Sequence, residues 1–384
     1  MQKKWRNLLI IAAVSLFSTL LLWLPFFLKL PSFWKIALPQ EGMATIMKNF
    51  DGLYYVVTSK SFYNPEFITS NFSFNLPAIY YSAHFPLYPF LIRLFSYPLG
   101  YLWSMISIPL IASVLSGFIF YFFVKEFKYS KYPLWLTIVF LLFPARWLIV
   151  RSVGSPEPLL ILFLITAFYF FKKKNYWLAG LFGGLAQLTK PPGFLIFGAF
   201  ATYLIYENWQ GIKTHFFNQI IKIVKKAYPL LIIPLTLVGI FTLYKFNYGN
   251  FWAYFQSGDN IHLFWPPLQI FNATSYWVGT FWLEEIIYVY FLGALGVVYL
   301  FKQKRIDLAI FTTLFFITTL FISHRDIARY SLPLMPFLII AFEPLLVKKE
   351  FKIAFAVIIL PIFLYALNFI ANNTAPIADW APFL

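Results

Sequence analysis

Long apolar runs separated by short polar breaks extend along almost the whole chain. Many approach the roughly 20 residues that an α-helix needs to cross a hydrocarbon core of about 30 Å. Lipid offers no hydrogen bonds to the backbone, so a helix is the element expected for each run. The pattern therefore predicts an all-α polytopic bundle of about eleven transmembrane helices. The predicted spans are 8–28, 101–124, 133–150, 156–171, 176–190, 192–206, 229–246, 286–301, 306–323, 330–346 and 353–370.

The basic residues give these helices an orientation. The first run follows Lys3, Lys4 and Arg6, but it is long enough to span and lacks a small-x-small cleavage site. We therefore interpret it as a retained helix, and the positive-inside rule predicts a cytoplasmic N-terminus. Crossing at each run places the other basic loops on the same side: Lys125, Lys128 and Lys131; Lys172 to Lys174; Lys213, Lys222, Lys225 and Lys226; Lys302, Lys304 and Arg305; Lys348, Lys349 and Lys352.

Two long segments, 29–100 and 247–285, fall on the extracytoplasmic side. A structureless loop of about seventy residues is improbable in a compact protein, so the first segment should contain interfacial or re-entrant helices. The second is rich in aromatic residues, which suit either sugar faces or an interfacial belt. We expect residues 1–384 to form one membrane-embedded domain.

Composition supports this interpretation. Hydrophobic residues make up 61% of the chain and charged residues only 11%, which excludes an ordinary soluble domain. The formal charge of +16 lies in short clusters between apolar runs, so topology explains it better than nucleic-acid binding. The absence of cysteine excludes disulfides and thiol chemistry, and no P-loop, dinucleotide fingerprint or His-Glu-x-x-His spacing is present.

Asp51 is the only aspartate of the first outer segment, in the sequence Asn49-Phe50-Asp51-Gly52. A carboxylate at that position can act as a general base. It can equally form an Asp-Gly turn or cap the following helix, and spacing alone does not decide between these roles.

A second feature is the sequence His84-Phe85-Pro86-Leu87-Tyr88-Pro89, in which two prolines three residues apart fix a turn before an apolar segment. The prolines are expected to start a helix at the membrane surface. His84 can hydrogen-bond a substrate or simply lie at the interface.

Ionisable residues also fall at the outer ends of predicted spans, where they are costly unless solvated, paired or used. Arg151 and Glu157 flank one outer turn, and they either pair to orient it or contact a substrate. Lys190, Arg325 and Arg329 are cations on a side that should be poor in them. An anionic ligand explains them, as does snorkelling to lipid phosphates.

The order of these features resembles the GT-C glycosyltransferases, and more narrowly the PIG-V-like mannosyltransferases of glycosylphosphatidylinositol anchor assembly and their prokaryotic relatives. The chain has Phe50, Ser155-Pro156-Glu157 and Lys190 where that family has Trp, Ser-Glu-Ser and Arg. The resemblance rests on Asp51-Gly52, Phe85-Pro86-Leu87-Tyr88-Pro89, Ser155-Pro156-Glu157, Gly183 to Lys190 with Gly193, and Arg329-Tyr330.

The resemblance implies a GT-C-like fold and an inverting transfer of a hexose, mannose in that family. The donor would be a polyprenyl-phosphate sugar and the acceptor a lipid or glycan hydroxyl at the extracytoplasmic membrane face. Asp51 would be the catalytic base. Lys190 and Arg329, with Arg151 or Arg325, would bind the donor phosphate, and His84, Tyr88, Glu157 and Tyr330 would contact substrate.

Other functions stay open from the sequence. A polytopic transporter or lipid flippase would use ionisable residues near span midpoints and two similar halves, whereas the charges here lie mainly at span ends. A non-catalytic GT-C-like partner in envelope assembly would keep the spans and tolerate loss of Asp51. No cofactor is expected, a metal requirement is open, and the short loops favour a prokaryotic cell membrane.

Overall fold

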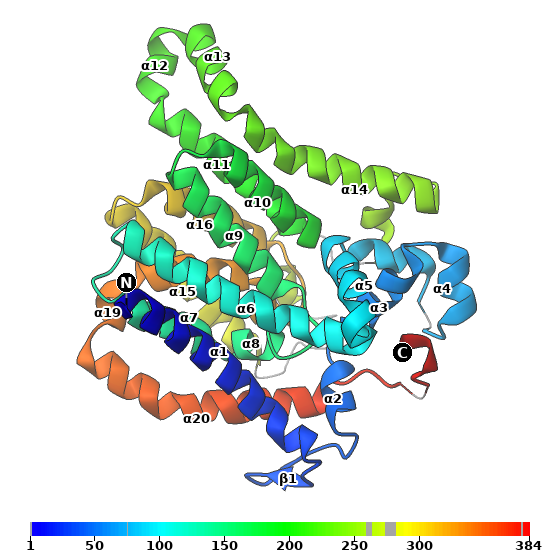
Figure 1. Cartoon of the computed structure of the whole chain (residues 1–384). Coiled ribbons are helices and arrows are strands. Elements are labelled where there is room, and N and C mark those ends of the chain that lie inside the picture. The colour runs from blue at the N-terminus through cyan, green and yellow to red at the C-terminus, as the bar shows by residue number, and fades with distance from the viewer. Residues whose placement is uncertain (1, 75, 259–262, 273–281, 378) are drawn as a thin grey trace. The chain divides into compact units, whose positions relative to one another are not determined.

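A computed structural model describes residues 2–74, 76–258, 263–272, 282–377 and 379–384 (Figure 1). The described residues are mostly helical. One two-stranded antiparallel hairpin pairs β1 (Ser32–Phe33) with β2 (Ile36–Ala37). The chain folds as two compact units, and α9 and α14 contribute residues to both.

Unit 1 comprises residues 1–162, 241–257 and 343–384. The long helices α1 and α6 pack closely at Gly117, which has no Cβ. An added Cβ at this position would lie only 2.8 Å from Ile11 Cγ2. Its helices are α1 (Gln2–Phe27), α2 (Met43–Met47), α3 (Gly52–Ser61), α4 (Pro65–Asn71), η1 (Ala78–Ala83), α5 (Leu87–Leu99), α6 (Tyr101–Glu126), α7 (Pro133–Leu142), α8 (Ala145–Val150), η4 (Ala253–Gln256), α19 (Glu343–Leu346), α20 (Lys349–Asn372), η8 (Ala381–Phe383), the start of α9 (Glu157–Lys172) and the end of α14 (Ile232–Tyr248).

Unit 2 comprises residues 163–240 and 258–342. Stacked Phe171 and Phe200 rings, with centroids 3.9 Å apart, join α9 to α11, and a Lys172–Asp307 ion pair of 2.5 Å joins α9 to α16. Besides parts of α9 and α14, its helices are α10 (Tyr176–Thr189), η2 (Pro191–Gly193), α11 (Phe194–Glu207), α12 (Trp209–Thr214), α13 (Phe216–Ala227), η3 (Tyr228–Leu231), η6 (Gln269–Phe271), α15 (Trp282–Lys302), α16 (Ile306–Leu320), α17 (Ile327–Tyr330), η7 (Leu332–Leu334) and α18 (Met335–Ala341).

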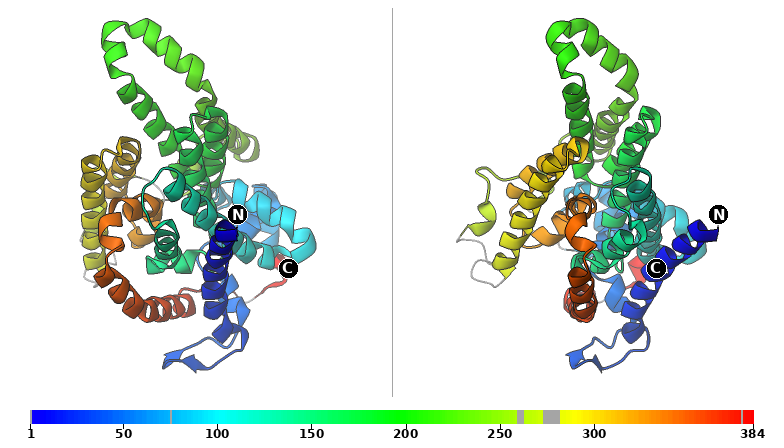
Figure 2. Two further views of the ribbon diagram at one scale, coloured as in Figure 1. Left: turned by 60° about the vertical axis from the view of Figure 1, so that its left-hand side comes forward. Right: turned by 90° about the vertical axis from the view of Figure 1, so that its left-hand side faces the viewer.

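Residues 194–227, drawn in green, form a helical hairpin that turns at α12 (Figure 2). Both views show α12 and α13 extending beyond the other helices of their unit.

Among the described residues, five helices are long and apolar enough to cross a membrane: Lys4–Phe27, Tyr101–Glu126, Phe216–Tyr248, Leu283–Lys302 and Lys349–Asn372. Each contains or overlaps one predicted span. Phe216–Tyr248 comprises α13, η3 and α14, and its predicted span, 229–246, lies outside α13. The chain is therefore an all-α membrane protein, as the apolar pattern predicted. The full count of about eleven spans stays a prediction.

The remaining predicted spans correspond to shorter helices. The predicted span 133–150 consists of α7 and α8, which Phe143 and Pro144 separate in extended conformation. The predicted span 330–346 consists of the end of α17, η7, α18 and α19, in a stretch that contains three prolines. The first outer segment, 29–100, carries α2, α3, α4, η1 and α5, and their location at a membrane interface stays a prediction.

Candidate active site

Asp51 occupies the N-cap position of α3, yet its side chain makes no capping hydrogen bond within the described structure. The preceding residue, Phe50, has a φ of +49°, and the Gly52 N–H donates to the Asn49 carbonyl, which closes a tight turn. The Asn49 side chain donates to the Ile370 carbonyl of α20 at 2.8 Å. The turn is thus anchored to α20, and capping does not occupy the carboxylate.

Gly52 and Gly154 bring two distant turns of unit 1 into direct backbone contact. A Cβ at Gly52 would lie 3.2 Å from Gly154 Cα, and a Cβ at Gly154 would lie 2.9 Å from Gly52 Cα. Met105 closes the same spot, since its Sδ would lie within 2.9 Å of either added carbon. The turn that carries Asp51 therefore packs against the turn that leads to Glu157.

The second carboxylate of this region, Glu157, is buried at the start of α9 and accepts a hydrogen bond from the hydroxyl of Ser155. Tyr88 of α5, also buried, donates its hydroxyl to the Met105 carbonyl. Burial, and then the negative charge of Glu157, raise the pKa of Tyr88 well above its ordinary value. The Tyr88 hydroxyl therefore keeps its proton and remains a hydrogen-bond donor close to Glu157.

Aromatic rings surround His84, which is 4% exposed. Its ring meets Tyr55 edge-to-face at 4.7 Å, and Tyr55 meets Tyr88 in the same way at 4.9 Å. Tyr63 donates its hydroxyl to the His84 carbonyl at 2.6 Å. Burial, and then the charge of Asp51, raise the pKa of Tyr54, which precedes Tyr55 on α3. Asp51, His84 and Tyr88 thus belong to one aromatic neighbourhood.

Arg151 is fully buried and has a different partner from the one suggested by its sequence position. Its guanidinium donates to the hydroxyls of Ser15, at 3.5 Å, and Ser18, both on α1. Within the described residues, these hydroxyls and not Glu157 are its recorded partners. Arg151 therefore ties the turn after α8 to α1, in agreement with an orienting role.

The other candidate cations lie in unit 2. Gly193 folds the Lys190-Pro-Pro turn back onto α10, because a Cβ there would overlap the backbone of Gln187. Lys190 Nζ lies 5.5 Å from the centroid of the Tyr330 ring. Arg329, near Tyr330 on α17, is 6% exposed, whereas Arg325 in the preceding loop is exposed.

The structure thus sorts the predicted residues by unit: Asp51, His84, Tyr88, Arg151 and Glu157 belong to unit 1, and Lys190, Arg325, Arg329 and Tyr330 to unit 2. Sequence reasoning missed Gly154, Met105 and Tyr55, which fix the Asp51 turn and the His84 ring. The only sequence signal for Gly154 is its place in a small-residue turn. Part of the second outer segment, 259–262 and 273–281, lies outside the described residues. Across the described ranges, no group of three or more metal-ligating side chains occurs.

Comparisons with known proteins address the fold. No protein-family model and no curated protein matches the sequence. Among solved structures, the chain is similar to the archaeal oligosaccharyltransferase AglB from Archaeoglobus fulgidus, in complex with an inhibitory peptide and a dolichol-phosphate, with a TM-score of 0.53 and 14% sequence identity. The match covers 98% of this chain and 57% of that one, so the chain spans little more than half of its neighbour's length. At this identity the similarity shows a shared fold and nothing narrower.

Proposed function

We propose that the protein is a GT-C-type glycosyltransferase that moves a sugar from a polyprenyl-phosphate carrier to an acceptor hydroxyl. The observation that carries the proposal is the contact between Gly52 and Gly154, which joins the Asp51 turn to the turn of Glu157. The fold similarity to an oligosaccharyltransferase whose structure contains a dolichol-phosphate supports the same class of chemistry. Mannose as the sugar rests on the resemblance to the PIG-V-like family.

In the proposed reaction, Asp51 accepts the proton of the acceptor hydroxyl as its oxygen attacks the anomeric carbon of the sugar. The bond between that carbon and the phosphate oxygen breaks, and the carrier leaves as polyprenyl phosphate. Attack opposite to the leaving group inverts the anomeric configuration. A general base of this kind contributes about 10²- to 10⁴-fold to the rate.

The leaving phosphate carries negative charge, so the reaction also needs cations. The resemblance to the PIG-V-like family assigns this role to Lys190 and Arg329, with Arg325 as a further exposed cation. Arg151 acts through the turn that it orients rather than on the phosphate, because α1 hydroxyls hold its guanidinium. His84, Tyr88, Glu157 and Tyr330 are assigned to substrate contacts.

The test is transfer of radiolabelled mannose from polyprenyl-phosphate mannose to lipid and glycan acceptors, in vesicles that contain the purified full chain. Asp51→Asn is expected to lower the rate by about 10²-fold or more. Asp379→Asn is the matched control, because Asp379 is exposed and, among the described residues, its Oδ1 accepts a hydrogen bond from the Ala381 N–H. Equal activity of the two variants would remove Asp51 from the base role.

The same assay separates the other candidate functions. A transporter or flippase would move the carrier lipid across the vesicle without a covalently glycosylated acceptor. A non-catalytic partner would give no product with any donor sugar. Glucose and galactose donors run in parallel distinguish a different sugar from an absent activity.

A further inference from the structure

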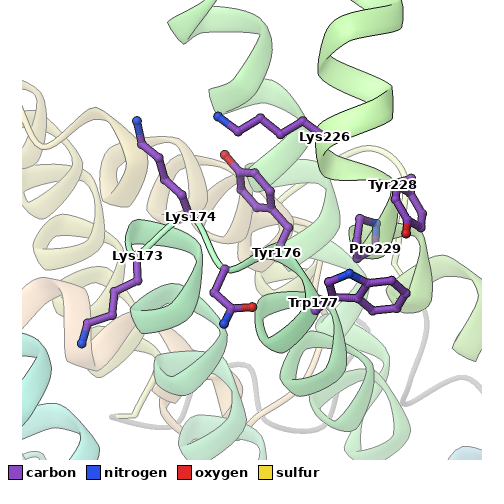
Figure 3. Close-up of a pocket in the computed structure, with 8 residues that line it drawn as sticks. Lys173, Lys174, Tyr176, Trp177, Lys226, Tyr228 and Pro229 are labelled. Atoms are coloured by element: carbon purple, nitrogen blue, oxygen red, sulfur yellow. The ribbon is translucent and has the colours of Figure 1, made fainter.

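A lysine-rich pocket lies in unit 2, and its lining includes none of the candidate residues of the active site. It forms between the turn that joins α9 to α10 and the junction of α13 with η3, and its volume is about 390 Å³ (Figure 3). Its lining residues include no carboxylate: they are Lys173, Lys174, Asn175, Tyr176, Trp177, Lys226, Tyr228 and Pro229.

Close backbone packing forms the wall of this pocket. A Cβ at Gly180 would overlap the Pro229 carbonyl, so α10 and η3 touch directly. Trp177 meets Tyr228 edge-to-face at 5.5 Å. The concavity is therefore a consequence of helix packing and does not depend on the conformation of a single surface side chain.

Two of the three lysines extend to the same side of the pocket. Figure 3 shows the side chains of Lys174 and Lys226 extending to the same side as the hydroxyl of Tyr176, and Lys226 Nζ lies 5.8 Å from the Tyr176 ring centroid. Lys173 extends the other way and lies 4.5 Å from the ring centroid of Tyr169. Lys174 and Lys226 come from segments about fifty residues apart, so the fold and not local sequence brings these charges together.

The helix that carries Lys226 has the pattern of a membrane-surface helix. Phe217, Ile221 and Val224 recur at helical spacing on α13 and are all exposed, by 77%, 50% and 53% respectively. The lysines of α13 are Lys222, which falls between two of these positions, and Lys225 and Lys226, which follow Val224. An amphipathic helix with a basic polar face lies in the plane of the interface, and Trp and Tyr favour the headgroup level. The pocket is thus suited to headgroup depth.

We propose that Lys174, Lys226 and Tyr176 bind the phosphate group of an anionic membrane lipid. Two ammonium groups and a hydroxyl supply donors for phosphate oxygens, while the Trp177 and Tyr228 rings form an amphipathic wall beside them. The positive-inside rule explains the sign of the charge on this predicted cytoplasmic side. It does not explain why Lys174 and Lys226, from distant segments, line the same pocket.

The test uses native mass spectrometry of the full chain in detergent, titrated with phosphatidylglycerol or phosphatidylcholine. The wild type is expected to bind phosphatidylglycerol more tightly, and Lys174→Gln/Lys226→Gln to weaken that binding about tenfold. Lys128→Gln/Lys131→Gln is the matched control. It removes equal charge from the same predicted side. Lys128 lies just after the end of α6 with a φ of +55°, as Lys174 lies just after the end of α9 with a φ of +57°.

Loss of preference in the pocket variant but not in the control supports the site. Equal weakening in both variants, or no preference in the wild type, overturns it. A competition with millimolar inorganic phosphate distinguishes the two sources of the ligand. If phosphate binds in a pocket-dependent manner and displaces the lipid, the ligand is free phosphate. If lipid binding is unchanged, the ligand is the lipid headgroup. Tyr176→Phe, which deletes one hydroxyl, should give a smaller loss of about twofold to fivefold.

Discussion

Gly154→Ala tests whether the contact between the two turns positions Asp51. The φ of Gly154 lies outside the left-handed region, so the alanine backbone is permitted and the cost of the change is steric. The added carbon would lie 2.8 Å from Met105 Cγ and Sδ and 2.9 Å from Gly52 Cα. The Met105 side chain can move aside, but Gly52 Cα can move only together with the start of α3.

Overpacking of this kind costs about 1–3 kcal/mol of folding free energy. The larger effect should be on catalysis, because a displacement of about 1 Å at the Asp51 turn is enough to lower the transfer rate by about 10²-fold. Removal of part of the clash in Gly154→Ala/Met105→Ala should restore some activity. The restoration is only partial because the contact with Gly52 remains.

The assay is initial mannosyl transfer in vesicles, with thermal unfolding in detergent as the readout of folding. Gly239→Ala is the control, since Gly239 is exposed on α14 and a Cβ there would meet nothing within 4 Å. The control should keep full activity and gain up to about 1 kcal/mol from helix propensity. Transfer by Gly154→Ala at the rate of the control would refute the positioning argument.

Two further predictions concern stability. Lys172→Met should destabilise the protein by about 2–4 kcal/mol in chemical unfolding, because it leaves the 8%-exposed carboxylate of Asp307 without its ion-pair partner. The double variant Lys172→Met/Asp307→Leu should recover most of this loss, and no recovery would contradict the pairing argument. The raised pKa of Tyr88 means that the folded state keeps a proton that the unfolded state releases near pH 10, so folding stability falls above that pH. Tyr88→Phe should lower this alkaline slope by up to about 1.4 kcal/mol per pH unit, and an unchanged slope would assign the alkaline loss to other groups.

Apolar run length predicted the long helices well, but the effect of individual prolines could not be predicted. Pro109 and Pro361 lie inside the continuous helices α6 and α20, whereas Pro144 lies in the break between α7 and α8. A helix tolerates proline where neighbours compensate for the freed backbone carbonyl. Those neighbours come from distant parts of the chain, so a local pattern cannot distinguish the two outcomes.

The candidate residues show the same limit. Residue type and position left open whether Asp51 forms a turn, caps the following helix or acts as a base. The structure places it at the N-cap of α3, where its side chain makes no capping hydrogen bond. From their spacing alone, Arg151 and Glu157 could form an ion pair. In the structure, the hydroxyls that accept hydrogen bonds from Arg151 lie more than a hundred residues earlier, on α1. Partners so remote in sequence leave no periodic signal.

Glycine contacts lie next to the candidate residues in both units. Helices in lipid gain little from a hydrophobic drive toward one another, so close backbone approach at small residues sets their geometry. Gly52 adjoins Asp51 and meets Gly154, and Gly193 meets the backbone of Gln187 to fold back the turn of Lys190. In each unit, the position of a charged candidate therefore depends on a contact that any larger residue would disturb. Rigid placement of this kind is what a general base and a phosphate-binding cation need, because their contribution falls steeply with displacement.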